Sequence, residues 1–216
     1  LVVEDSRYAS EAMRLLCLRS GARIRRADNL KSAHRHLSVY RPSVLIVDLG
    51  LPDGSGIDLI KEAAGATPRV SVILGISGDP SSERAALEAG ADSFLVKPID
   101  TLSAFQSRVL SHLPKNRQPS RPRVVSNETI APDPLALHED LTHIAELLGT
   151  TDQDDRIVAY VARFLEGVGR IAHDRPLSQA AERLAREQEA GQAASASLGA
   201  VRELVNDRLN THRKAV

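Results

Sequence analysis

The fold of this chain is decided by residues 44–56, which read VLIVDLGLPDGSG. Four apolar residues, Val44 to Val47, predict a short buried strand, and Asp48 stands at its end. The proline, glycines and serine that follow predict a turn, with a helix starting near Ser55. A buried apolar strand that leads into a helix is typical of a parallel sheet with helices on both faces.

On either side of this stretch, short apolar runs alternate with amphipathic segments, which is the pattern of repeated strand-helix units. Strands are predicted at residues 1–3, 22–27, 43–47, 70–76 and 93–96. Helices are predicted to start near Ser6, Asn29, Ser55, Ser81 and Thr101, because each is a common capping residue. We therefore expect residues 1–113 to form a doubly wound α/β domain with a five-stranded parallel sheet.

The character of the sequence changes after residue 113. Residues 114–123 contain three prolines and four basic residues, and we expect residues 114–131 to be a linker. From residue 132 the spacing of apolar residues follows the helical period, with Asp133 and Pro134 at the start of the first helix and Gly149 at its end. A second helix is predicted to open with Asp152, Asp154 and Asp155, and further helices are predicted over 176–190 and around 198–209. Residues 132–216 should form a small all-α bundle.

Polar residues follow four of the predicted strands. Strand ends in a parallel sheet meet at one rim, where ligands bind, so these side chains should converge there. They are Glu4, Asp5, Asp48, Ser77 and Lys97. Converging carboxylates repel one another unless a cation neutralises them, and hard oxygen ligands suit Mg²⁺.

A carboxylate beside a metal, with an ammonium and a hydroxyl opposite, fits attack on a phosphoryl group. Asp48 is the predicted nucleophile, because it ends the most continuously apolar strand and should be held rigidly at the centre of the rim. Ser77 could then hydrogen-bond the resulting phosphate and draw in the loop that follows it.

Three segments carry a resemblance to a known family: residues 2–6, 47–56 and 89–98, which read VVEDS, VDLGLPDGSG and AGADSFLVKP. Together they resemble the receiver domain of two-component response regulators, a flavodoxin-like fold, over about residues 1–113. The resemblance implies Glu4, Asp5 and Asp48 as Mg²⁺ ligands, with the Gly50 carbonyl as a further ligand. It also implies Asp48 as phosphoacceptor and a histidine kinase or histidine phosphotransfer protein as phosphodonor.

The same resemblance implies three switch residues. Lys97 would pair with the phosphate, Ser77 would be the switch hydroxyl, and Phe94 would be the aromatic whose rotamer follows phosphorylation. Two departures from the family pattern are Glu4, where aspartate is commoner, and Gly78, where alanine is more usual. The extra methylene of Glu4 should move it toward water-mediated contact with the metal.

The bulk composition limits the remaining possibilities. The chain has one cysteine, so an internal disulfide framework is excluded, and no apolar run approaches the roughly 18 residues that span a bilayer. We expect a cytoplasmic protein without membrane partners. Basic and acidic residues balance over the whole chain at 28 each, but residues 124–216 hold 10 basic and 15 acidic residues.

This acidic bundle is expected to be a protein-interaction or dimerisation module with an unknown protein target, and a homodimer is left open. DNA binding is the alternative, but it is disfavoured because no basic recognition helix is evident, and no nucleic-acid site is predicted. A lesser alternative is a histidine phosphotransfer module, because His138-Glu139 is faintly similar to the histidine step of histidine kinases. No catalytic constellation stands out in the bundle, so we expect no enzyme beyond self-phosphorylation and autodephosphorylation.

Overall fold

The computed structural model describes residues 1–99, 101–118, 130–149 and 154–213. Contacts divide the chain into two compact units. The first unit comprises Leu1–Asp5 and Ser10–Pro132, and the second comprises Ser6–Ala9 and Asp133–Val216. None of the described helices has the length and apolar character needed to cross a membrane.

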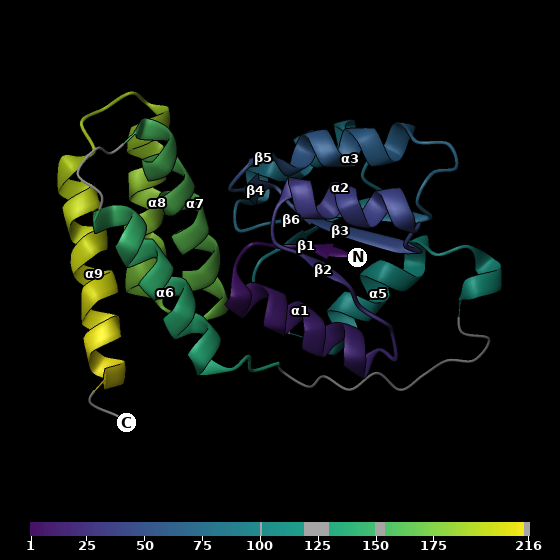
Figure 1. Cartoon of the computed structure of the whole chain (residues 1–216), viewed down its shortest axis with the longest axis horizontal. Coiled ribbons are helices and arrows are strands. Elements are labelled where there is room, and N and C mark those ends of the chain that lie inside the picture. Colours follow the sequence, from purple (N-terminus) through teal and green to yellow (C-terminus); the bar gives the residue numbers. More distant parts are fainter. Residues whose placement is uncertain (100, 119–129, 150–153, 214–216) are drawn as a thin grey trace. The chain divides into compact units, whose positions relative to one another are not determined.

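The first unit is built on a parallel sheet of five strands in the order β2-β1-β3-β6-β7 (Figure 1). The strands are β1 (Val2–Val3), β2 (Arg26–Ala27), β3 (Val44–Asp48), β6 (Val72–Ser77) and β7 (Ser93–Val96). The helices are α1 (Arg7–Arg19), α2 (Leu30–Val39), α3 (Gly56–Gly65), α4 (Glu83–Glu88) and α5 (Leu102–His112), with a 3₁₀ turn, η2, at Lys115–Arg117. The predicted doubly wound α/β fold is confirmed.

The two faces of the sheet bury alternate residues of the same strands, as the period of a strand requires. Val3, Leu45 and Val47 belong to a core cluster with residues of α2, α3 and α4. Val2 and Ile46 belong to a second cluster with residues of α1 and α5. Helices therefore cover both faces, and β3, paired with β1 and β6, lies at the centre of the sheet.

Two local predictions differ from the structure. The helix expected near Ser81 begins at Glu83, after a 3₁₀ turn, η1 (Pro80–Ser82). The reason is that the carboxylate of Asp79 accepts hydrogen bonds from the Ser81 N–H at 2.8 Å and the Ser81 hydroxyl at 2.6 Å, which ties Ser81 into the turn. A two-stranded ribbon of β4 (Gly50–Leu51) and β5 (Gly54–Ser55) was not predicted.

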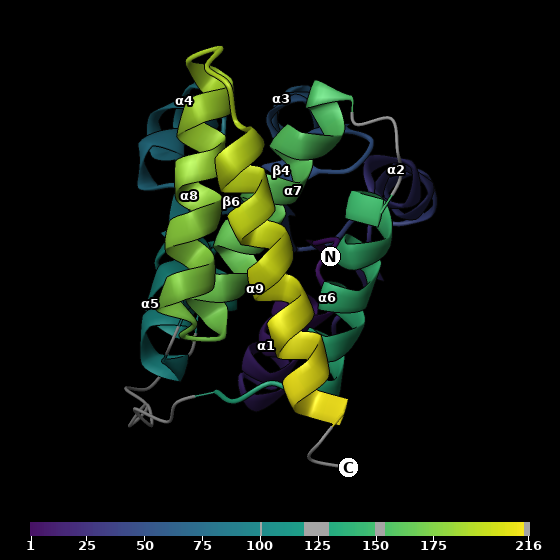
Figure 2. The same ribbon diagram turned by 90° about the vertical axis from the view of Figure 1, so that its left-hand side faces the viewer.

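The second unit contains four helices in its described part: α6 (Pro134–Gly149), α7 (Asp155–Ile171), α8 (Arg175–Glu189) and α9 (Ser195–Arg213). Figure 2 shows them after a turn of 90° about the vertical axis of Figure 1. Helix α7 contacts α8, α8 contacts α9, and α9 returns to α6. Apolar residues of all four helices, including Ile144, Val161, Leu184 and Val201, form one core cluster. The apolar stripes of these helices therefore close within a single chain.

The predicted linker, 114–131, falls mostly on residues 119–129, which lie outside the described residues. The same holds for Asp152, which the sequence placed ahead of the second bundle helix. Asp154 caps that helix by accepting a hydrogen bond from the Arg156 N–H at 3.0 Å.

Candidate functional site

Three strands carry the charged residues of the candidate site to one rim of the sheet. Asp48 is the last residue of β3, and the next residue is held to β6 by a hydrogen bond from the Leu49 N–H to the Ile76 carbonyl at 3.2 Å. Glu4 follows β1, and its N–H bonds the Ala27 carbonyl at 2.9 Å. Lys97 follows β7, and its N–H bonds the Ser77 carbonyl at 2.8 Å. Backbone hydrogen bonds thus fix all three positions.

The side chain of Lys97 joins two of these carboxylates. Its Nζ lies 2.7 Å from Glu4 Oε2 and 3.1 Å from Asp48 Oδ1. All three residues are buried, at 3% exposed for Glu4, 7% for Asp48 and 6% for Lys97. Burial of charged groups costs free energy, and even a paired buried charge adds little net stability. A buried cluster of three charged residues therefore indicates a functional site.

The pKa values follow from this arrangement. Burial raises the pKa of Glu4 well above its usual value, with the carboxylates of Asp48 and Asp5 adding to the effect and Lys97 opposing it. Burial alone would lower the pKa of Lys97, but the carboxylates of Asp48 and Glu4 outweigh it and raise that pKa above its usual value. Lys97 is therefore a permanent cation in this site at neutral pH.

A metal ion could be held by Glu4, Asp5 and Asp48. Each offers one carboxylate oxygen, and these three oxygens lie within 4.8 Å of one another. Asp5 is half-buried and open to solvent, whereas the other two are buried. Three hard oxygen ligands with access to water suit Mg²⁺, which keeps part of its hydration shell. The residues present fit that ion. A single Lys97 ammonium does not neutralise three carboxylates, so a bound cation would balance the remaining negative charge.

Glu4 has a role that the sequence did not predict. Its longer side chain reaches Lys97, and this contact is shorter than the one between Lys97 and Asp48. Glu4 therefore shares the cation that faces the predicted phosphoacceptor.

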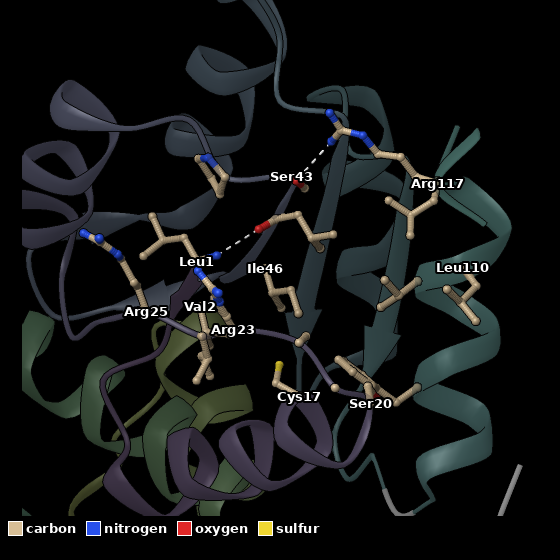
Figure 3. Close-up of a pocket in the computed structure, with 18 of the residues that line it drawn as sticks. Leu1, Val2, Cys17, Ser20, Arg23, Arg25, Ser43, Ile46, Leu110 and Arg117 are labelled. Carbon is tan, nitrogen blue, oxygen red and sulfur yellow. Dashed lines mark hydrogen bonds between the residues drawn. The ribbon is translucent and has the colours of Figure 1, made fainter. Parts of the chain in front are cut away.

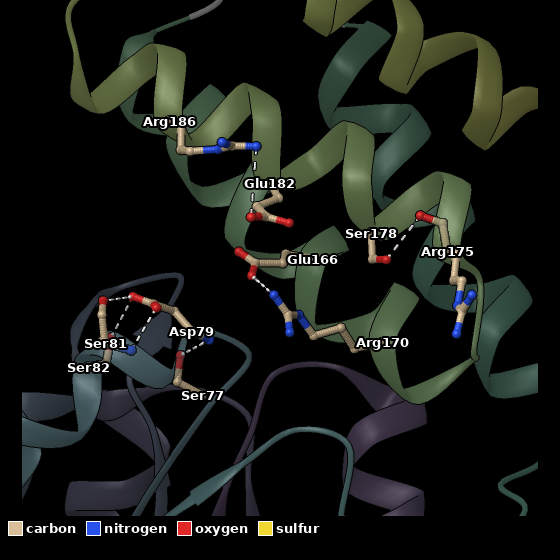
Figure 4. A network of polar contacts seen from close by, with 10 residues as sticks. All are labelled: Ser77, Asp79, Ser81, Ser82, Glu166, Arg170, Arg175, Ser178, Glu182 and Arg186. Atoms are coloured by element: carbon tan, nitrogen blue, oxygen red, sulfur yellow. Dashed lines mark hydrogen bonds and ion pairs between the residues drawn. The ribbon is translucent and has the colours of Figure 1, made fainter.

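The predicted switch residues Ser77 and Phe94 lie in β6 and β7, the two strands on one side of β3. Ser77 ends β6, and its hydroxyl oxygen accepts a hydrogen bond from the Asp79 N–H at 3.1 Å (Figure 4). Phe94 lies in β7 and is buried in the core cluster that faces α3 and α4. Gly50 lies in β4, where it pairs with Ser55. The side-chain contacts described above join Glu4, Asp48 and Lys97 directly, and Ser77 is connected to Lys97 through the backbone.

Gly56 is a positioning residue that the sequence analysis missed. A Cβ atom at this position would lie 2.0 Å from the Asp48 carbonyl oxygen, well inside van der Waals contact. Its N–H also bonds the Leu49 carbonyl at 3.2 Å. Only glycine allows the start of α3 to approach the end of β3 so closely. The glycines of residues 54–56 were the available signal, but they were interpreted simply as a turn.

Asp53 was also missed. Its carboxylate accepts hydrogen bonds from the Leu30 N–H at 2.8 Å and the Lys31 N–H at 3.0 Å, at the start of α2. It therefore ties the loop after β3 to a helix distant in sequence, which supports the position of that loop.

In the second unit, two charged pairs join residues one turn apart on a single helix, a partly buried pair on α7 and an exposed pair on α8. Glu166 accepts a bond from Arg170 at 2.8 Å, one helical turn away, and Glu182 lies 3.8 Å from Arg186 (Figure 4). His138 is half-buried on α6 and His143 is exposed. His173 has a φ of 55° and lies in the turn between α7 and α8.

Comparison with known proteins identifies the first unit. Residues 1–107 match the family model described as the response regulator receiver domain. This part of the chain is therefore a response regulator receiver domain, as its motifs predicted.

Curated relatives extend the comparison. The KDP operon transcriptional regulatory protein KdpE of Escherichia coli (strain K12) is 31% identical over 142 residues, which are 66% of this chain and 58% of that protein. The transcriptional regulatory protein KdpE of Mycobacterium tuberculosis (strain CDC 1551 / Oshkosh) is 32% identical over 116 residues, which are 54% of this chain and 51% of that protein. The chain thus spans about half the length of the curated relatives it matches.

A solved structure is similar as well. It is the signal receiver domain of a signal transduction histidine kinase from Syntrophus aciditrophicus, 27% identical, with a TM-score of 0.48. The similarity covers 57% of this chain and 96% of that one.

Proposed function

We propose that this chain is a two-component response regulator whose receiver domain is phosphorylated on Asp48 by a histidine kinase or a histidine phosphotransfer protein in the cytoplasm. The observation that carries the proposal is the buried Lys97 ammonium, 3.1 Å from Asp48 Oδ1 at the rim of a receiver sheet. We place Mg²⁺ on Glu4, Asp5, Asp48 and the Gly50 carbonyl.

In the proposed reaction, a carboxylate oxygen of Asp48 attacks the phosphorus of a phosphohistidine. The bond from phosphorus to the donor imidazole nitrogen breaks, and the electron pair and the ring nitrogen stay with the donor. Bound Mg²⁺ would neutralise charge on the transferring oxygens. Lys97 supplies the second positive charge, and because it is fixed before the reaction it needs little reorganisation.

Ser77 is suited to the switch role in this scheme. Its oxygen already accepts a bond from the Asp79 N–H, but its own hydroxyl proton remains free to be donated to a phosphate oxygen. A hydrogen bond to the phosphate would draw the end of β6 and the following turn toward Asp48. Phe94 on the neighbouring strand would then repack, which is the predicted readout of phosphorylation. We assign the domain no catalytic activity beyond its own phosphorylation and dephosphorylation.

Labelling with a small radioactive phosphodonor tests the assignment. Asp48→Asn should abolish Mg²⁺-dependent labelling, because the amide is a poor nucleophile. Asp58→Asn is the matched control, since Asp58 is an exposed carboxylate on α3 of the same domain. Equal labelling of the Asp48 variant and the wild-type protein would refute the proposal, as would equal loss in both variants.

For the output we infer transcriptional regulation. The relatives are named as transcriptional regulatory proteins, which supports the alternative set out in the sequence analysis over an interaction or dimerisation module. The expectation that DNA is a disfavoured partner loses support for the same reason. The apolar stripes of the bundle are buried within one chain, so their burial does not provide a driving force for dimerisation.

The output can be tested on the full chain with and without beryllofluoride, which mimics the phosphoryl group. A transcriptional regulator should bind DNA more tightly in the activated form, as measured by mobility shift on a library of promoter fragments. If beryllofluoride leaves DNA binding unchanged and the activated chain captures a protein instead, the output is a protein-interaction module and not transcriptional regulation.

A further inference from the structure

Four arginines of the receiver unit surround one cavity (Figure 3). They are Arg23, Arg25, Arg41 and Arg117. The walls of the cavity are mainly apolar, and among the described residues that line the cavity there is no aspartate or glutamate. The lining residues include Leu1, Ser43 and Val44, which stand at or before the amino ends of β1 and β3. The cluster therefore lies at the opposite end of the strands from Asp48.

Two of these arginines are held by neighbouring side chains. The guanidinium carbon of Arg25 lies 4.4 Å from the ring centroid of Tyr40, and Arg117 donates a hydrogen bond to the Ser43 hydroxyl at 3.1 Å. Within the described ranges, none of the four comes within ion-pair distance of a carboxylate. All four are exposed.

The positive charge continues along the sequence on both sides of the cavity. Residues 19–41 contain seven arginines and lysines against one acidic residue, Asp28. Residues 115–123 add Lys115, Arg121 and Arg123 to Arg117 and contain no acidic residue. Unpaired like charges repel one another, so such a concentration lowers stability unless an anionic partner is present.

We propose that this arginine cluster binds the phosphate backbone of double-stranded DNA. The proposal rests on the transcriptional output inferred above and assigns the DNA contact to the receiver in place of the bundle. The guanidinium group is a planar fork that matches phosphate oxygens, and the cluster is composed of arginine rather than lysine. The segment 124–216, with 10 basic and 15 acidic residues, is poorly suited to a polyanion.

The position of the cluster fits this role. DNA bound at the amino ends of the strands would leave the carboxyl ends accessible to the kinase and to Mg²⁺. Contacts to phosphates position a protein on DNA without reading its sequence, so the cluster would supply affinity and a salt dependence rather than sequence specificity.

The test measures binding of the full chain to a short fluorescein-labelled duplex by anisotropy, between about 50 and 200 mM salt. The variant is Arg23→Gln/Arg41→Gln, since both side chains are exposed. The matched control is Lys61→Gln/Arg84→Gln, which removes the same charge from exposed positions on α3 and α4. Phosphodonor labelling of Asp48 shows that each variant is folded.

The cluster variant should lose about two units of the slope of log affinity against log salt, while the control keeps the wild-type slope. Equal loss in both variants would overturn the proposal, because net charge alone would then explain it. Binding of a polyaspartate peptide as tightly as DNA would also overturn it, in favour of an acidic protein partner. A wild-type salt slope in the cluster variant, with DNA binding and Asp48 labelling intact, refutes this inference alone. Failure of the wild-type chain to bind DNA also refutes the transcriptional output, and loss of Asp48 labelling in the wild-type protein refutes the proposed phosphorylation.

Discussion

The two units use charge in opposite ways. The receiver buries Glu4, Asp48 and Lys97 together at the ends of three strands that are far apart in sequence. In the bundle, the exposed side chains of Glu182 and Arg186 pair one turn apart along a single helix. The first arrangement needs the whole fold to assemble it, and the second needs only one helix. Charges that are costly to bury and distant in sequence therefore indicate function more reliably than charges that stabilise a local element.

The largest change in stability is expected from removal of the buried Lys97 cation. Lys97→Met leaves Glu4 and Asp48 buried without their partner, and we expect a loss of about 3–5 kcal/mol of receiver stability in metal-free buffer. Amide hydrogen exchange, read separately on receiver and bundle peptides, would measure it. Added Mg²⁺ should recover part of the loss, because the ion replaces the missing charge.

Two further variants sharpen this result. Glu4→Gln in the Lys97→Met background should recover stability, since it removes one of the unpaired carboxylates. Arg186→Gln breaks the exposed pair with Glu182 on α8 and should cost under about 1 kcal/mol. If the receiver and bundle variants cost the same, the contrast between the two units is wrong.

A smaller effect, but one located at the phosphorylation site, is expected for Gly56→Ala. The added methyl group would overlap the Asp48 carbonyl, so the end of β3 or the start of α3 must shift, at a cost of about 2–3 kcal/mol. Mg²⁺-dependent labelling of Asp48 should fall as well, because its side chain moves with the backbone.

Gly65→Ala provides the control for this substitution. A Cβ atom there meets nothing within 4 Å, so the variant should keep full labelling and gain a few tenths of a kcal/mol from the higher helix propensity of alanine. Normal labelling in Gly56→Ala would show that the close approach does not position Asp48.

Gly56 also illustrates what could and could not be predicted from the sequence. The five strands along the chain were predicted from periodicity. The convergence of Glu4, Asp48 and Lys97 was predicted from the rule that strand ends in a parallel sheet meet at one rim. The overlap at Gly56 depends on an angle between strand and helix that no local pattern encodes. The pairing of Glu4 with Lys97 likewise required side-chain positions. In the bundle, periodicity predicted the helices but not that their stripes close within one chain, because the same stripes could equally pair two chains.

In the bundle, a close approach of two helices at Gly169 offers a test without charge. A Cβ atom at Gly169 of α7 would lie 2.9 Å from the backbone nitrogen of Ser178 on α8. Gly169→Ala should push these helices apart and cost about 1–2 kcal/mol of bundle stability. Gly199→Ala on α9, where a Cβ meets nothing within 4 Å, should be neutral or stabilising. Exchange in receiver peptides should not change, and a change there would mean that the units do not behave as separate units.

The smallest effect is expected where the bundle joins two helices through charge. Arg208 of α9 donates hydrogen bonds to Asp174 at 2.9 and 3.2 Å, and Asp174 also caps α8 through the Leu177 N–H. Partial burial alone would raise the pKa of Asp174, but Arg208 and the Leu177 N–H hold it below its usual value. The carboxylate therefore stabilises the folded bundle at neutral pH, and this contribution is lost as pH falls through the folded-state pKa.

Asp174→Asn separates these two roles, because asparagine still caps the helix but carries no charge. We expect a loss of about 0.5–1 kcal/mol at neutral pH, discounted because the pair is partly exposed to solvent. Bundle stability measured by urea titration between neutral pH and about pH 3 should fall less steeply in the variant than in the wild-type protein. Parallel curves would mean that the Asp174–Arg208 pair contributes no net free energy. The receiver would then be the only unit in which pairing of charges between elements matters.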